Sequence, residues 1–94
     1  MHNAIIAYDK IKVKDGKMIR LYYITLSGEY QGRYVEIYAR DKDRAVWNTE
    51  RVFGVMNVST VYTAKAWRKK STENLISVGK IESEDEREYR RLRR

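Results

Sequence analysis

The sequence lacks cysteine altogether and contains a single histidine, His2. Without cysteine the chain can form no disulfide, no thiolate nucleophile and no cysteine-ligated metal site, so its stability has to come from packing. A single imidazole near the N-terminal end also excludes most metal sites and most acid–base catalysis. These absences argue against an enzyme, and we expect neither a metal nor another cofactor.

Catalytic motifs are missing as well. No glycine-rich phosphate loop stands between a predicted strand and a predicted helix, and no nucleophilic triad of the usual kinds can be assembled. A two-metal nuclease would need clustered carboxylates, for which the candidates are Asp9, Glu36, Asp41 and Asp43. These side chains are explained more simply as surface charges, cross-strand partners of lysine and helix N-caps. We therefore expect no catalytic residues.

The sequence also has no apolar run of membrane-spanning length and no secretory leader pattern. We expect a soluble, cytoplasmic protein that binds no membrane. Its 94 residues suffice for one domain with a modest core, and no repeat and no Pro-rich or Gly/Ser-rich linker divides them. The predicted organisation is a single basic α+β domain over residues 1–81, followed by a charged C-terminal helix or tail over residues 82–94.

Positive charge is what the chain has in excess. It contains 20 Lys and Arg against 13 Asp and Glu, a formal net charge of +7. Such a surplus fits nucleic acid, an anionic membrane or an acidic protein surface as the partner. Residues 82–94 contain five basic and five acidic side chains. The whole surplus therefore belongs to residues 1–81.

Three stretches in the first half of the chain predict strands. Residues 4–14 alternate apolar with Tyr or Lys side chains, residues 18–26 are rich in Ile, Leu and Tyr, and residues 34–39 alternate again. Asp15-Gly16 predicts a hairpin turn between the first two, and residues 27–32 predict a looser second turn. We expect these strands to form an antiparallel three-stranded meander.

Residues 41–53 predict one amphipathic helix. A step of about 100° per residue places an apolar set on its core face. The set is Ala45, Val46, Thr49, Val52 and Phe53. Asp41 or Asp43 can cap the first free amides, and Gly54 supplies a left-handed stop after the helix.

The rest of the chain predicts one or two further strands and a short C-terminal helix or tail. Residues 58–67 are dense in β-branched and aromatic side chains, and residues 75–81 are a weaker strand candidate. Trp67 is expected in the core. Ser83 followed by Glu86 fits a capping box, and the acidic-then-basic order of the tail favours a helix. The predicted fold class is therefore α+β.

The face of the meander away from the helix is the first candidate site. Aromatic rings can stack on unpaired bases while ammonium groups contact phosphates, and a three-stranded sheet can instead lie in a DNA major groove. The cationic loop formed by Arg68, Lys69 and Lys70 adds further candidate phosphate contacts. The candidate nucleic-acid contacts are Tyr8, Lys10, Lys12, Lys14, Tyr34, Tyr38, Arg68, Lys69 and Lys70. The alternative is that the tyrosines are half-buried rings covering the open face of the sheet, and that the loop is merely solvated.

The outer face of the predicted helix is the second candidate site. The rotation that buries the apolar set places Arg40, Arg44, Trp47 and Arg51 together on the opposite side. An exposed Trp among arginines is typical of a protein–protein contact. The alternatives are that the arginines form salt bridges along the helix and that Trp47 packs under the C-terminal helix.

These sites lead to three functional hypotheses. The first is a small non-enzymatic protein that binds DNA or RNA through the sheet face or the Arg/Trp helix face. The second is an accessory protein of the kind encoded by viruses or mobile elements, which inhibits or adapts an acidic host protein through Trp47 and its flanking arginines. The third is a homodimer formed by an edge strand or by the charged tail.

The order of three strands followed by a helix is similar to that of small sheet-reading DNA-binding domains in integrases and plant transcription factors. The likeness lies in the order of elements alone, and no sequence motif accompanies it.

Overall fold

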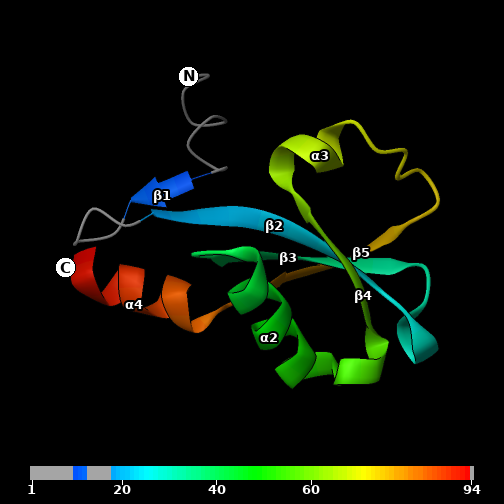
Figure 1. Cartoon of the computed structure of the whole chain (residues 1–94), viewed down its shortest axis with the longest axis horizontal. Helices are drawn as coiled ribbons and strands as arrows, with labels where there is room; N and C mark the ends of the chain where they lie inside the picture. Colours follow the sequence, from blue (N-terminus) through cyan, green and yellow to red (C-terminus); the bar gives the residue numbers. More distant parts are fainter. Residues whose placement is uncertain (1–9, 13–17, 94) are drawn as a thin grey trace.

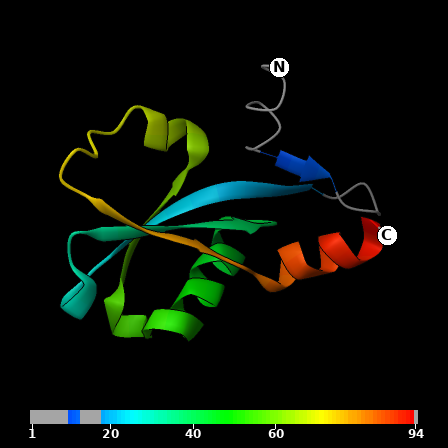
Figure 2. The same cartoon turned by 180° about the vertical axis from the view of Figure 1, so that it is seen from behind.

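The computed structural model describes residues 10–12 and 18–93, and it confirms the α+β class (Figure 1). The elements in chain order are β1 (Lys10–Lys12), β2 (Met18–Leu26), the 3-10 turn η1 (Gly28–Tyr30), β3 (Arg33–Ala39), α2 (Lys42–Phe53), the 3-10 turn η2 (Val55–Asn57), β4 (Val58–Thr63), α3 (Ala64–Arg68), β5 (Ile76–Ile81) and α4 (Glu84–Arg93). In both Figure 1 and Figure 2, α2 and α3 lie on opposite faces of one sheet and α4 lies beyond one end of it.

Strand β2 is the centre of the sheet. It pairs antiparallel with β3 along one edge, and along its other edge with β1 and then with β4. Strand β5 extends the sheet on the far side of β3 and runs parallel to it. A parallel partner needs a crossover, and the chain between β3 and β5 supplies one. The observed sheet therefore contains the antiparallel β1–β2–β3 order but is mixed as a whole, which the predicted meander does not describe.

The prediction of a strand over residues 58–67 is wrong in its second half. Strand β4 ends at Thr63, and the short helix α3 follows. Thr63 caps this helix, because its hydroxyl oxygen accepts a hydrogen bond of 3.1 Å from the backbone N–H of Ala66. Threonine is a good N-cap and alanine a good helix former, so a local helix signal overrides the β-branched and aromatic composition.

Helix α2 covers one sheet face, and both of its ends follow the predicted pattern. The Asp41 carboxylate accepts a hydrogen bond of 2.8 Å from the backbone N–H of Arg44. Gly54 ends the helix with a φ of 96°, a conformation that favours glycine, and its N–H donates to the carbonyl of Glu50. Asp41 is thus the N-cap rather than Asp43.

The core lies between α2 and this sheet face, with one exception to the predicted set. It is built by Tyr22, Ile24, Leu26, Val35, Ile37, Ala39 and Ala45, with Val46 and Phe53 packed against them. Thr49 is buried as predicted, but Val52 is 59% exposed. Val52 lines an open hollow of about 240 Å³ between α2 and the start of α4, so the last turn of the helix has no core beneath that side chain.

Helix α4 begins with the predicted cap. The Ser83 hydroxyl oxygen accepts a hydrogen bond of 3.0 Å from the backbone N–H of Glu86, and the hydroxyl donates to the carbonyl of Tyr38 in β3. Ser83 is fully buried. The cap therefore also ties the first turn of α4 to the sheet.

Within the described ranges, no helix is both long enough and apolar enough to cross a lipid bilayer.

Candidate functional site

An aromatic cluster fixes α3 on the sheet face opposite α2. The Trp67 ring stacks on Tyr23 of β2, with centroids 4.8 Å apart and planes 1° from parallel. Tyr34 of β3 and Tyr62 of β4 contact the same indole at 4.8 and 5.4 Å. Trp67 is only 8% exposed, which confirms it as a core residue. The cluster holds α3 in one place because three strands each supply a ring to it.

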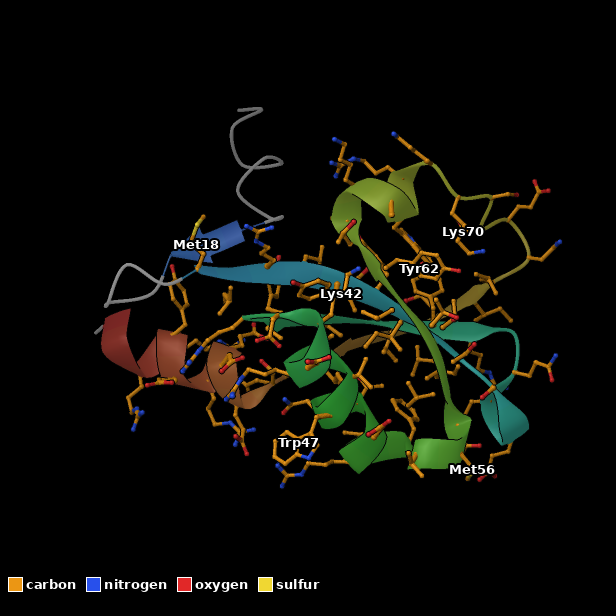
Figure 3. All side chains as sticks on the ribbon, viewed as in Figure 1. Met18, Lys42, Trp47, Met56, Tyr62 and Lys70 are labelled. Atoms are coloured by element: carbon orange, nitrogen blue, oxygen red, sulfur yellow. The ribbon has the colours of Figure 1, made fainter. Side chains whose placement is uncertain are left out.

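Cations surround this helix. We call the set Arg20, Lys65, Arg68, Lys69 and Lys70 the α3 surface; its members are exposed except for the half-buried Lys70. The Lys70 ammonium lies 5.2 Å from the centroid of the Tyr62 ring, as the two labelled side chains in Figure 3 illustrate. Within residues 10–12 and 18–93, no carboxylate forms an ion pair with Arg20, Lys65, Lys69 or Lys70. Their positive charge is therefore presented to solvent.

A cavity of about 290 Å³ opens between this helix and β2. Its lining consists of Arg20, Leu21, Tyr22, Thr63, Ala64, Lys65 and Arg68. Burial raises the pKa of Tyr22 above its usual value, the Arg20 charge partly opposes this, and the Asp41 charge adds to it. The phenol is therefore protonated at neutral pH and can donate a hydrogen bond.

The arginines of the predicted Arg/Trp face have a different environment, because α4 lies against them. The buried carboxylate of Asp85 accepts hydrogen bonds from the backbone N–H of Arg40 at 2.9 Å and from Nε of Arg44 at 3.0 Å. Arg40 Nε lies 3.3 Å from the same carboxylate. Hydrogen bonding and the charge of Asp85 raise the pKa of Arg44. The guanidinium groups of Arg40 and Arg44 are thus both bound by Asp85 of the same chain.

Two further ion pairs complete what we call the α2–α4 contact, formed by Arg40, Arg44 and Arg51 with Glu84, Asp85 and Glu88. Arg51 Nη1 lies 2.9 Å from Glu84, and Arg40 Nη2 lies 3.4 Å from Glu88. The arginines do form salt bridges, but their partners come from α4 rather than from neighbours along α2. This long-range pairing was not among the alternatives that the sequence suggested.

Trp47 remains half open on the outer side of α2. Trp47 is 49% exposed, and the Arg51 guanidinium carbon lies 4.7 Å from the centroid of its ring. Together with Asp43 and Arg44 it lines a shallow hollow of about 440 Å³. Figure 3 shows Trp47 on the opposite side of the molecule from Tyr62 and Lys70. The two candidate sites therefore face different directions.

The predicted tyrosine platform is only partly available in the structure. Tyr34 is half-buried beside Trp67, and Tyr38 is 9% exposed in a second apolar cluster with Ile19 and Leu21. Lys10 and Lys12 lie in β1, whereas Tyr8 and Lys14 lie outside the described residues. Among the predicted nucleic-acid contacts, the structure thus brings together Tyr34, Arg68, Lys69 and Lys70 around α3.

The sequence reasoning missed Arg20 as a member of this site, and it noted Lys65 only as a cation near the loop of Arg68 to Lys70 in sequence. The segment Thr63-Ala64-Lys65-Ala66 carries the signal that would have placed Lys65, since it combines an N-cap with helix formers. No local signal identifies Arg20, because its exposure depends on which edge of β2 is covered. In the part of the chain that the structure describes, no three His, Asp or Glu side chains gather as a metal site would require.

No family model matches the chain, and no curated protein or solved structure matches it either.

Proposed function

We propose that this protein binds nucleic acid through the α3 surface, without catalysing a reaction. The observation that carries the proposal is the unequal pairing of charge. Around α2 the arginines are neutralised by α4, whereas around α3 Arg20, Lys65, Lys69 and Lys70 have no carboxylate partner in the described ranges. A cluster of unpaired cations on a rigid support is the electrostatic footprint expected for phosphate binding.

The rings of the aromatic cluster pack against Trp67, so they fix α3 in place and offer little open surface on which bases could stack. Tyr23 and Tyr34 contact Trp67, and the Lys70 ammonium lies over the ring of Tyr62. We therefore expect phosphate contacts to supply most of the affinity and base stacking to add little. Such binding depends steeply on salt, with a slope of about 0.9 per neutralised phosphate on duplex DNA and about 0.7 on single strands.

A charge-reversal experiment tests the proposal. Fluorescence anisotropy of labelled duplex DNA, single-stranded DNA and RNA is measured at roughly 50 and 200 mM salt. Lys69→Glu with Lys70→Glu should weaken binding at least about tenfold at the lower salt and flatten the salt dependence. The matched control is Arg87→Glu with Arg91→Glu on the exposed side of α4, which changes the net charge equally. Thermal melting checks that both variants remain folded.

Two results would contradict the proposal. Absence of binding by the unmodified protein at low salt would leave the net charge without a nucleic-acid role. Equal weakening by the two double variants would mean that the protein binds through its total charge rather than through the α3 surface.

A protein-binding role through Trp47 is the second candidate function. The specific observation is a half-exposed indole that lines a hollow and lies under the Arg51 guanidinium. Trp and Arg dominate the energetics of many interfaces. Affinity purification should then recover a partner that Trp47→Ala loses and that Lys69→Glu with Lys70→Glu retains. A partner retained by Trp47→Ala would rule out this anchor.

A further inference from the structure

The cavity beside α3 has the chemistry of an anion site. Of its seven lining residues, three are cations and none is acidic. They come from two elements, since Arg20 projects from β2 and Lys65 and Arg68 from α3. Cations gathered around one hollow repel one another, and an anion bound between them relieves that repulsion.

Two of these cations are available to bind a ligand. Both Arg20 and Lys65 are exposed, and neither forms an ion pair with a carboxylate of the described residues. The contrast with Arg44 shows what a carboxylate partner does to an arginine in this protein, because Asp85 holds its guanidinium at 3.0 Å. No comparable contact occupies the guanidinium of Arg20 within the described ranges.

The neutral lining residues fit the same class of ligand. Ala64 is small and lies in the first turn of α3, where it lines the cavity together with Arg20 and Lys65. The Thr63 hydroxyl accepts from the Ala66 N–H, so its own proton can be donated to an anion. The Tyr22 phenol, protonated at neutral pH, offers a further donor on the cavity wall.

We infer that this cavity binds one phosphate group of a nucleic acid, held by the Arg20 guanidinium and the Lys65 ammonium. Guanidinium groups recognise phosphate oxygens in a bidentate manner, and an ammonium adds a compact charge. The inference rests on the proposed function and refines it, because it makes one phosphate position fixed while Lys69 and Lys70 contact the neighbouring backbone. The phosphate can be internal to a strand or a terminal phosphomonoester.

The first experiment needs no variant. Inorganic phosphate is titrated into ¹⁵N-labelled protein at constant ionic strength, with chloride as the balancing anion. We expect saturable shifts at the amides of Arg20, Ala64 and Lys65, and smaller shifts at Arg87 and Arg91 on α4. Shifts that are spread evenly over all exposed cations, or that match those caused by chloride, would overturn the site.

The second experiment separates the cavity from the rest of the surface. Arg20→Gln should weaken oligonucleotide binding by about tenfold, the size expected for losing a charged hydrogen bond, whereas the control Arg87→Gln should have little effect. Equal effects of the two variants would overturn the cavity site. If Arg20→Gln does not fold, Lys65→Gln replaces it with the same expectation.

The two proposals fail in distinguishable ways. Loss of binding in Lys69→Glu with Lys70→Glu, together with no effect of Arg20→Gln, upholds the nucleic-acid function and removes the cavity site. Localised phosphate shifts without any oligonucleotide binding remove the nucleic-acid function and overturn the stated ligand. A 5′-phosphorylated oligonucleotide that binds more tightly than its 5′-hydroxyl form, with the difference lost in Arg20→Gln, assigns the site to a terminal phosphate; equal binding assigns it to an internal one.

Discussion

The α3 surface and the α2–α4 contact are both rich in cations, but their cations have different neighbours. Beside α2, the acidic first half of α4 places Glu84, Asp85 and Glu88 within ion-pair distance of three arginines. Beside α3, the described chain supplies no carboxylate to Arg20 or to Lys65, Lys69 and Lys70. The net charge of the chain does not distinguish these two regions. Of these two sets, the arginines of the α2–α4 contact have carboxylate partners, whereas Arg20, Lys65, Lys69 and Lys70 have none among the described residues.

The two regions also differ in how their helices are held. Four aromatic rings fix α3, and such packing depends little on ionic strength. Ion pairs hold much of α4, although Ser83 and Asp85 are buried at its start. Exposed ion pairs weaken as salt screens them. We therefore expect α3 to stay in place over a range of salt concentrations in which the α4 contacts loosen.

Trp67→Ala is the variant with the largest expected effect on this comparison. Removing a buried indole from between Tyr23, Tyr34 and Tyr62 should lower the free energy of unfolding by about 3–5 kcal/mol. Urea denaturation at low and high salt measures the loss, which should be nearly the same in both. Trp47→Ala, on the exposed side of α2, is the matched Trp control. A loss below about 1 kcal/mol for Trp67→Ala would mean that the cluster does not anchor α3.

Asp85→Ala tests the other region and should have the next largest effect. It removes the acceptor of the Arg40 N–H and the partner of two guanidinium groups. Because the side chains of Arg40 and Arg44 are about one-third exposed or more, water can partly replace the carboxylate. We expect a loss of about 2–3 kcal/mol, less than for a fully buried pair.

The control for Asp85→Ala is Glu88→Ala, which removes a half-exposed carboxylate paired with the same Arg40. It should cost less than about 1 kcal/mol, and the cost should shrink further at high salt. If the two variants were equally destabilising, burial of Asp85 would not be what holds α4 against α2.

Glu84→Gln tests whether the ion pairs with α4 keep the arginines of the α2–α4 contact from binding nucleic acid. It leaves Arg51 without the carboxylate that lies 2.9 Å away. Arg51 lies beside Trp47, away from the α3 surface, so freeing it should leave binding at the α3 surface unchanged and add a second, weaker contact site. The overall affinity should then rise by about two- to threefold at low salt, the scale of one exposed ion pair. Glu29→Gln removes the same charge from η1, an element that takes no part in the α2–α4 contact. Equal gains in both variants would show that net charge, rather than unmasking, determines affinity.

The parts of the fold that the sequence predicted well are those with local causes. The cap of α2 by Asp41, its end at Gly54 and the Ser83 cap of α4 each involve residues three or four positions apart. The alternation in β3 also placed Val35 and Ile37 on the core side. Such features depend on neighbours in the sequence, so the sequence displays them directly.

The errors and omissions have long-range causes. Arg44 is bound by Asp85, 41 positions further along the chain, and no periodicity reveals that contact. Tyr38 lies on the predicted face of the sheet, but the alternation could not show that Ile19 and Leu21 would bury it. Val52 has the helical phase of a core residue but is exposed, because it borders an open hollow between α2 and the start of α4. A pattern gives the direction of a side chain, whereas burial depends on what the rest of the chain places there.

Trp47→Ala should have the smallest effect on nucleic-acid binding, and that small effect is informative. Trp47 lies on the outer side of α2, and α2 and α3 cover opposite faces of the sheet, so one nucleic acid lying on the α3 surface does not reach the indole (Figure 3). We expect the affinity to change by less than about twofold and the free energy of unfolding by less than about 1 kcal/mol, as is usual for exposed positions. Anisotropy and urea denaturation measure the two quantities on the same sample. A loss of affinity as large as that of Lys69→Glu with Lys70→Glu, in a folded protein, would break the comparison, because the masked side of the molecule would then be the one that binds.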